Sequence, residues 1–157
     1  MAKKSPHQNV ICQNRKAGFR FEILEKVECG LVLVGSEVKS LRDGNASIEE
    51  AYARIERGEL WLIDSHVQTY DFAHASNHEP RRPRKLLIHK RELNKLRPQV
   101  EQKGLTLVPL YLYFNDRGLA KVTIGLARGK TRGDKRQAIK KREHKREMDR
   151  ALRGRHR

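Results

Sequence analysis

The sequence predicts a mainly β fold with short helices: an OB-like antiparallel β-barrel that carries a basic C-terminal tail. Apolar and polar residues alternate in short runs separated by glycine-containing turns, which is typical of antiparallel strands. Strands do not alternate with long helices, so a parallel sheet is not expected, and closure into a small barrel removes exposed strand edges. Lys and Arg concentrate in the last thirty residues, where the apolar alternation ends.

These observations divide the 157 residues into three parts. Residues 1–13 are polar and unpatterned and are expected to form a flexible N-terminal arm. Residues 14–127 are long enough to bury one core and are expected to form the barrel. Residues 128–157 are expected to form the tail.

The barrel is expected to begin with strands between Phe19 and Val34, broken by a turn or bulge at Cys29-Gly30, where glycine relaxes the backbone. A short helix over residues 37–42 follows. Ser36 is expected to cap this helix, which stops at Asp43-Gly44.

Two β-hairpins are expected further along the chain. The first joins residues 51–56 to residues 60–64 across a turn that contains Gly58. The second joins residues 106–114 to residues 121–127, and both of its arms alternate with period two.

A polar segment lies between these hairpins and is followed by a helix over residues 91–96. Pro98 is expected to end or kink this helix, because proline lacks the backbone donor. His74 and His78 have a spacing that could hold a metal on a helix, but they lie among loop-forming residues. We expect them to form local hydrogen bonds or to contact phosphate, and no metal site is expected.

Charge is the clearest sign of a partner. The last thirty residues hold fourteen Lys and Arg against four Asp and Glu, a net charge of +10 out of +16 for the chain. Such a block repels itself and is expected to be disordered when free, and it favours binding to a polyanion such as RNA. The alternative is a solvated tail that only improves solubility.

Other features point to a soluble cytoplasmic monomer. Cys12 and Cys29 show no CxxC pattern and are expected to be reduced thiols. No apolar run reaches membrane-spanning length, and no signal peptide is evident.

The sequence contains no motif for catalysis or for a cofactor, so an enzyme is not expected. Asp64 and Asp71 could serve a nuclease, but nothing beyond their presence suggests it. The cation-rich run over residues 81–89 is a better candidate for an RNA contact, and a solvated loop followed by a buried strand is its alternative. Tyr111, Tyr113 and Phe114 could stack on bases, although packing is the favoured interpretation because apolar residues occupy both faces of their strand.

Four motifs taken together resemble the small protein B family, whose members bind transfer-messenger RNA (tmRNA) in bacteria. They are residues 14–17, 35–42, 82–89 and 129–136, and they occur in the same order as in that family. The resemblance implies an OB-like barrel that binds the tRNA-like domain of tmRNA and delivers it to ribosomes stalled on messages without a stop codon. The tail is implied to become helical in the decoding centre and the empty message channel, so that the pair mimics a tRNA.

The resemblance also implies the site residues. The positions of RNA contact fall on Glu28, Leu87 and His89, and whether Leu87 is core or surface stays open. Basic residues of the matching motifs are added to these contacts: Lys16, Lys39, Arg42, Arg84 and Lys85. In the tail, Asp134 is expected to cap a helix, and the residues expected in the ribosomal decoding region are Lys130, Asp134, Lys135, Arg136, Lys140, Lys141, Arg142, Lys145 and Arg146.

The implied partners are tmRNA, the 70S ribosome with its small-subunit rRNA, and alanyl-tmRNA carried by elongation factor Tu with GTP. No cofactor is implied. Thr131 and Gly133 depart from the family pattern in the tail. The alternative functions are a basic protein that holds ribosomal RNA constitutively or assists ribosome assembly, and an RNA-processing enzyme.

Overall fold

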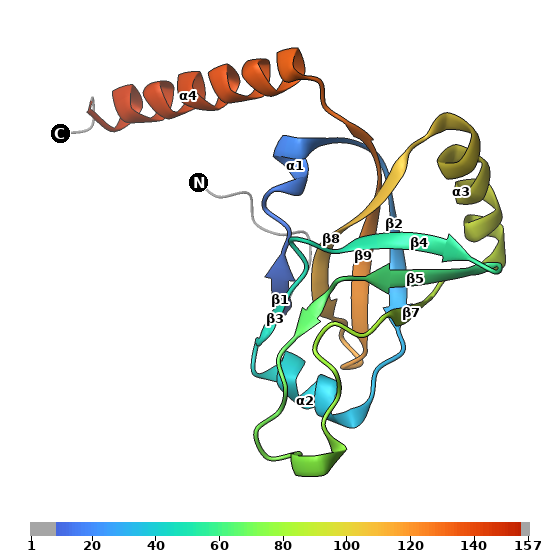
Figure 1. Cartoon of the computed structure of the whole chain (residues 1–157). Coiled ribbons are helices and arrows are strands. Elements are labelled where there is room, and N and C mark those ends of the chain that lie inside the picture. Colours follow the sequence, from blue (N-terminus) through green and yellow to red (C-terminus); the bar gives the residue numbers. More distant parts are fainter. Residues whose placement is uncertain (1–8, 155–157) are drawn as a thin grey trace.

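The computed structural model describes residues 9–154, which form a mainly β fold with a few helices (Figure 1). The elements in chain order are β1 (Val10–Gln13), α1 (Ala17–Arg20), β2 (Phe21–Leu31), α2 (Gly35–Arg42), β3 (Ala46–Ser47), β4 (Tyr52–Glu56), β5 (Glu59–Ile63), β6 (His66–Val67), η1 (His74–Ser76), β7 (Arg84–Leu87), α3 (Lys90–Lys103), β8 (Thr106–Phe114), β9 (Ala120–Gly129) and α4 (Arg132–Gly154).

Seven strands form one antiparallel sheet in the order β1-β8-β4-β5-β7-β2-β9. Because β9 also pairs with β8, the strands from β8 to β9 form a ring of pairings, and β1 is attached outside it. β3 and β6 form a separate two-stranded sheet. The core lies inside the ring and includes Leu60, Leu62, Leu107 and Ile124, each 1% exposed.

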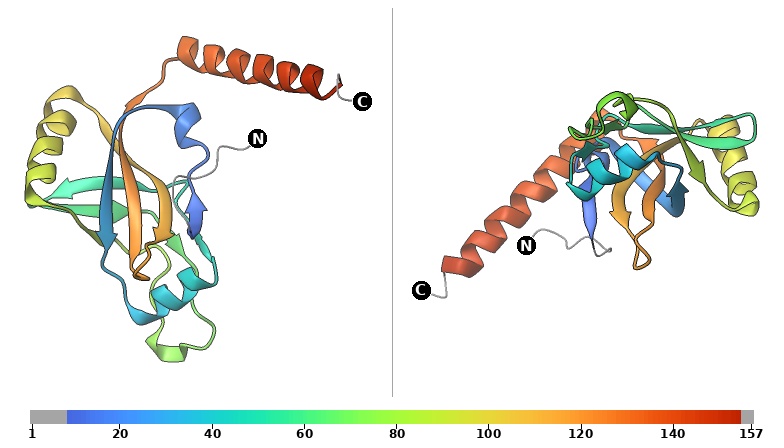
Figure 2. Two further views of the ribbon diagram at one scale, coloured as in Figure 1. Left: turned by 180° about the vertical axis from the view of Figure 1, so that it is seen from behind. Right: turned by 90° about the horizontal axis from the view of Figure 1, so that it is seen from below.

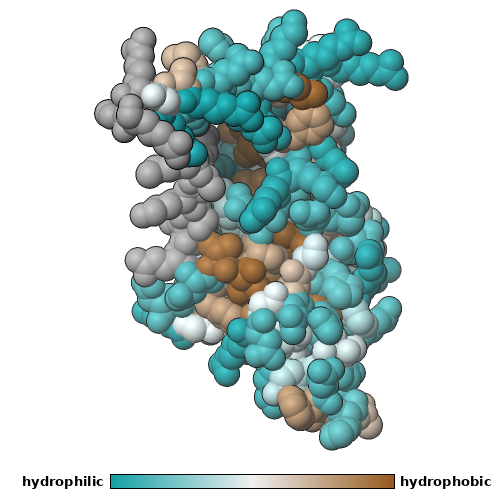
Figure 3. Space-filling view, turned by 90° about the vertical axis from the view of Figure 1, so that its left-hand side faces the viewer, coloured by the Kyte–Doolittle hydropathy of each residue, from teal (hydrophilic) through white to brown (hydrophobic). Residues whose placement is uncertain are grey.

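The helices lie around this ring, and α4 extends away from it (Figure 1). The views from behind and from below also show α4 projecting beyond the strands (Figure 2). Hydrophilic side chains cover most of the face drawn in Figure 3, apart from an apolar area near its middle. A largely hydrophilic surface agrees with the 34% of charged residues in the sequence.

Both expected hairpins are confirmed. β4 and β5 pair across Arg57 and Gly58, which both have positive φ, as a tight two-residue turn requires. β8 and β9 pair across a longer turn in which the Asn115 side chain accepts hydrogen bonds from the N–H groups of Arg117 and Leu119.

The N-terminal half differs from the prediction in two places. Val10–Gln13, expected in the flexible arm, forms β1 and pairs with β8. β2 begins at Phe21, since Phe19 lies in α1, and it continues without a break through Gly30. A Cβ on Gly30 would lie 3.3 Å from the Leu87 Cβ, so this glycine permits the close approach of β7 and does not form a turn.

The predicted stop of the first helix at Asp43-Gly44 is confirmed, because α2 ends at Arg42 with Asp43 as its C-cap. Two other predicted helix boundaries differ from the structure. Ser36 does not cap α2: Val34 occupies the N-cap position, and its N–H donates to Glu37 Oε1 at 3.1 Å. Pro98 does not end α3, which runs to Lys103 and stops at Gly104, where φ is +63°. Because Leu93 and Leu96 anchor α3 in the core, packing outweighs the local cost of the proline.

A buried ion pair connects α2 to β7. The Glu37 carboxylate is fully buried and accepts hydrogen bonds from the guanidinium groups of Arg84 and Arg82. Arg84, itself 1% exposed, also donates to the Ser65 carbonyl at 2.9 Å and to the Pro80 carbonyl at 3.1 Å. One arginine therefore holds α2, the end of β5 and the segment before β7 together.

These contacts set the charge state of Glu37. Burial alone would raise the pKa of Glu37, but hydrogen bonds from Arg84, Arg82 and the Val34 N–H lower the pKa below its ordinary value. The stabilising contribution is therefore complete above the unfolded pKa of about 4.3 and is lost as pH falls through the lower folded value.

Glu37→Gln should lower the free energy of unfolding by about 3 to 5 kcal/mol at neutral pH, because it leaves Arg84 with an unbalanced buried charge. Urea denaturation measures this loss. The difference from the unaltered protein should begin to shrink below about pH 4.3, where Glu37 of the unfolded chain becomes protonated, and should disappear below the lower pKa of the folded state. Glu59→Gln is the control, since Glu59 pairs with Lys85 at the surface and its loss should cost less than about 1 kcal/mol. Equal stability of the Glu37→Gln variant and the unaltered protein would contradict this account.

Candidate RNA interface

Three of the residues expected to contact RNA, Glu28, Leu87 and His89, meet at one surface formed by β2, β7 and β9. This surface is lined by Glu28, Gly30, Leu87, Ile88, His89 and Lys121. The pairing explains the arrangement, because Gly30 of β2 lies opposite Leu87 of β7 on one side and opposite Lys121 of β9 on the other. The structure thus brings together a carboxylate, an apolar side chain, an imidazole and an ammonium group, hereafter the β2–β7–β9 surface.

Leu87 is a surface residue. It is 54% exposed, whereas its neighbour Leu86 is 2% exposed and lies in the core, as strand alternation requires. Lys85 shares the outward face of β7 with Leu87, and its ammonium group lies 2.8 Å from Glu59 Oε1. Its exposure excludes a place for Leu87 in the core, and its contact with RNA stays a prediction.

Arg84, expected as an RNA contact, is placed in the interior. Its guanidinium is directed to Glu37, and burial lowers the pKa of Arg84, although an arginine starts high enough to stay charged. Arg84 is not available to a phosphate on the surface. We therefore assign it a structural role and remove it from the expected contacts.

The remaining basic residues lie elsewhere on the molecule. Lys39 and Arg42 are exposed on α2, and the Lys39 ammonium lies 5.5 Å from the centre of the Tyr70 ring. Lys16 lies 3.1 Å from Glu49 and 3.8 Å from Glu50. These three cations are outside the β2–β7–β9 surface.

Lys121 is the member of this surface that sequence reasoning missed. In the sequence it is one charged residue in an alternating run, and only the pairing of β9 with β2 brings it beside Leu87 and Glu28. The aromatic residues of β8 pack as favoured: Tyr113 is 3% exposed, and Tyr111 and Phe114 pack against the core.

His78 forms local hydrogen bonds, as expected. Its Nδ1 lies 2.8 Å from the Ser36 hydroxyl, and its Nε2 lies 2.9 Å from the Val67 carbonyl. His74 is exposed in η1. Within residues 9–154, no group of three or more His, Cys, Asp and Glu side chains is placed to hold a metal ion.

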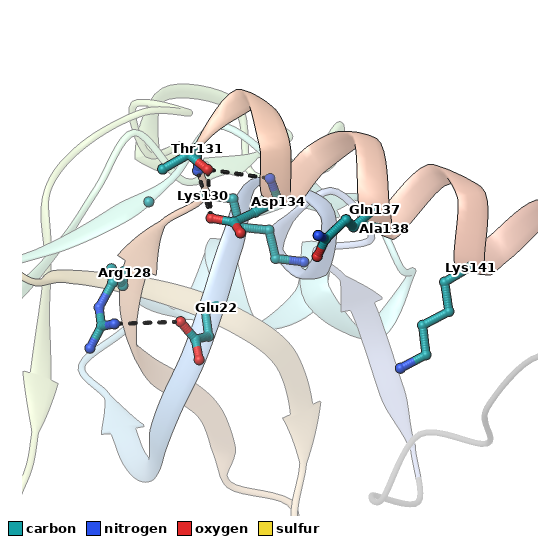
Figure 4. A pocket seen from close by; sticks show the side chains of 9 residues that line it. Glu22, Arg128, Lys130, Thr131, Asp134, Gln137, Ala138 and Lys141 are labelled. Atoms are coloured by element: carbon teal, nitrogen blue, oxygen red, sulfur yellow. Dashed lines mark hydrogen bonds and ion pairs between the residues drawn. The ribbon is translucent and has the colours of Figure 1, made fainter.

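The tail starts with a capping box. The Asp134 N–H donates to Thr131 Oγ1 at 3.3 Å, and the Thr131 N–H and hydroxyl donate to Asp134 Oδ2 at 3.1 Å and 2.7 Å (Figure 4). Hydrogen bonds from Thr131 lower the pKa of Asp134. Thr131 therefore caps α4, and Asp134, expected as the cap, lies in its first turn.

Few contacts connect α4 to the rest of the protein. The Lys130 ammonium donates to the Gly18 carbonyl at 2.8 Å, and the Arg142 guanidinium lies 5.9 Å from the centre of the Phe19 ring. None of the described residues of α4 is buried. The expected tail cations Lys135, Arg136, Lys140, Lys141, Arg142, Lys145 and Arg146 therefore lie along a helix whose sides are largely open to a partner.

Comparison with known proteins identifies the family of the chain. Residues 11–154 match the protein family described as "SmpB protein". The chain belongs to the SmpB family.

Similar proteins cover nearly the whole chain. An "SsrA-binding protein" of Brucella canis is 54% identical over 153 residues, which cover 98% of this chain and 97% of that relative. An "SsrA-binding protein" of Rhodopirellula baltica is 52% identical over 151 residues, which cover 96% of this chain and 86% of that relative. A solved structure described as "tmRNA-SmpB: a journey to the center of the bacterial ribosome" contains a chain that is 51% identical, with a TM-score of 0.65, and the match covers 82% of this chain and 93% of that chain.

Among residues 9–154, no helix has the length and apolar character needed to cross a membrane. The long helix of this SmpB family member is α4, which is rich in Lys and Arg.

In this SmpB family member, Thr131→Val should weaken the first turn of α4, because the valine side chain can neither accept from the Asp134 N–H nor donate to its carboxylate, and only the backbone N–H of residue 131 still donates to Asp134. Loss of a cap costs about 1 kcal/mol, so amide hydrogen exchange in residues 132–136 should become roughly fivefold faster. Thr106→Val, at the exposed start of β8, is the matched control and should leave this exchange unchanged. Unchanged exchange in Thr131→Val would show that the capping box does not stabilise α4.

Proposed function

We propose that this protein binds the tRNA-like domain of tmRNA and delivers it to ribosomes stalled on messages that lack a stop codon. The observation that carries this proposal is the similarity, over nearly the full chain, to proteins named SsrA-binding protein. The match to a chain of the tmRNA-SmpB structure supports the same RNA and the ribosome as partners. The SmpB family is an RNA-binding family, and the protein contributes binding and positioning, not catalysis.

The ring of strands acts as an OB-like barrel that presents the β2–β7–β9 surface to the tRNA-like domain. Glu28 accepts hydrogen bonds from base edges or 2′-hydroxyls, Leu87 packs on an unstacked base, and His89 stacks or donates. Lys121 adds a positive charge for the neighbouring phosphates. This set of groups suits RNA loops better than a regular duplex, whose base edges are less accessible.

The tail acts in the decoding centre and the empty message channel, so that tmRNA and protein together mimic a tRNA. Its cations follow a path lined by rRNA phosphates, and their mutual repulsion weakens α4 in the free protein, so that the tail becomes fully ordered only when it is bound. A message that continues downstream excludes the tail sterically. Selectivity for stalled ribosomes therefore needs no sequence recognition.

The protein acts as a cytoplasmic monomer and needs no cofactor of its own. It reaches the ribosome with alanyl-tmRNA, elongation factor Tu and GTP. Lys16, Lys39 and Arg42 lie outside the β2–β7–β9 surface and provide further phosphate contacts during this delivery.

Purification of the protein from cells, followed by sequencing of the bound RNA, should yield tmRNA as the dominant species. A version that ends at Lys130 should still retrieve tmRNA, because β9 ends at Gly129, but it should fail to support peptide tagging. Recovery of bulk rRNA without tmRNA would favour constitutive ribosome binding, and a spread of cleaved RNAs would favour a processing enzyme. Tagging by the shortened version would contradict the role of the tail.

Alanine replacement of Glu28, Leu87 or His89 should weaken binding to the isolated tRNA-like domain by about 1 to 3 kcal/mol each, the usual scale for a base-edge or stacking contact. The melting temperature should hardly change for Leu87→Ala and His89→Ala, since both side chains are exposed, and should fall modestly for Glu28→Ala, which removes the acceptor of the Tyr113 hydroxyl. Leu24→Ala is the control, because Leu24 is an exposed leucine of β2 outside the β2–β7–β9 surface. A lower melting temperature with unchanged affinity for the Leu87→Ala variant would exclude Leu87 as a contact.

A further inference from the structure

Glu28 is held by a residue from another strand. The Tyr113 hydroxyl of β8 donates a hydrogen bond to Glu28 Oε2 on β2. β9 lies between these two strands, where Lys121 pairs with Tyr113 and Thr123 pairs with Glu28. The Tyr113 side chain therefore reaches across β9 to the carboxylate.

Tyr113 is buried and can therefore restrict the motion of the Glu28 side chain. It is 3% exposed, and its hydroxyl is also hydrogen-bonded to the side chain of Thr123, which is 6% exposed. Burial, then the hydrogen bond and charge of Glu28, raise the pKa of Tyr113, so the phenol stays protonated and donates to the carboxylate. A chain of hydrogen bonds thus runs from a buried threonine to an exposed glutamate.

We infer that Tyr113 is a positioning residue for RNA recognition: its hydroxyl fixes the Glu28 carboxylate so that Oε1 is directed to a hydrogen-bond donor of the RNA. This inference rests on the proposed function and names the part of the RNA that the surface reads. A carboxylate repels phosphate and accepts from base N–H groups and 2′-hydroxyls. The group that Glu28 contacts is therefore a base edge or a 2′-hydroxyl, not the phosphate backbone.

Fixing Glu28 matters because an exposed glutamate samples several rotamers. Ordering such a side chain on binding costs free energy, and a partner that orders it beforehand removes this cost. Tyr113 is suited to the task, since its ring is packed among the strands and does not have to be ordered on binding. Its role is distinct from that of Leu87 and His89, which present their own side chains to the RNA.

The test is a double-mutant cycle in the full-length protein, with an in vitro transcript of the tRNA-like domain as the probe. Tyr113→Phe should weaken binding about fivefold, because the Glu28 side chain must then be ordered on binding, and it should lower the free energy of unfolding by no more than the value of one hydrogen bond. Glu28→Ala should weaken binding further, and adding Tyr113→Phe to Glu28→Ala should cause no additional loss. The dependence of affinity on salt should be the same for Tyr113→Phe and the unaltered protein, because no phosphate contact is removed.

Two further variants sharpen the test. Tyr52→Phe removes a hydroxyl from an exposed tyrosine of β4 and should leave the affinity unchanged. Glu28→Asp keeps the charge but withdraws the carboxylate by one methylene, so it should weaken binding by at least the same factor as Tyr113→Phe. If Tyr113→Phe folds poorly, the affinity of Glu28→Asp for the transcript tests the inference instead.

Full affinity of Tyr113→Phe or of Glu28→Asp would overturn the inference. An equal loss from Tyr113→Phe with and without Glu28 would overturn it as well, because Tyr113 would then act independently of Glu28. If the unaltered protein fails to bind the transcript, the proposed function itself is wrong. If it binds and Glu28→Ala weakens binding while Tyr113→Phe does not, only the role of Tyr113 is wrong.

Discussion

The arrangement of this protein depends on the buried ion pair between Glu37 and Arg84. β7 is only four residues long, and its apolar pattern alone sets its position in the sheet weakly. A shift of β7 by one residue would bring Arg84 to the surface and leave Glu37 buried without its charge partner, which is strongly unfavourable. The pair therefore fixes the register that places Leu87 beside Gly30.

The hairpins could be predicted because their signals are local. Alternation over β8 and β9, and glycine turns with positive φ, specify the strands without knowledge of the rest of the chain. β1 could not be predicted, since Val10–Gln13 becomes a strand only by pairing with β8. The effect of Pro98 could not be predicted for the same reason. Local propensity places a helix end or a kink at this proline, but packing of α3 on the core keeps the helix running to Lys103.

Only part of the candidate site could be predicted from the residues themselves. A run of four cations before an apolar strand indicated RNA, but composition cannot distinguish the buried Arg84 from its exposed neighbours. Glu28, Leu87 and His89 followed from the family resemblance, and strand pairing shows why they belong together. The sequence does not single out Lys121, and it predicts only packing or base stacking for Tyr113, since each acquires its place beside Glu28 only through neighbours on other strands.

The β2–β7–β9 surface and the helix α4 are suited to different kinds of RNA contact. In the proposed function, the β2–β7–β9 surface benefits from side chains that are fixed before binding, and the Tyr113 hydrogen bond to Glu28 would fix one of them. The proposed role of the tail is to enter a confined space. Because α4 has no buried residue and starts at the local capping box of Thr131 and Asp134, its displacement would remove no core contact of the ring. Because the capping box depends on no contact with the ring, α4 can begin at the same residue whether it is in solution or against an RNA surface. In the proposed function, contacts between the cations of α4 and RNA phosphates would then add to the stability of a helix that already begins at its own capping box.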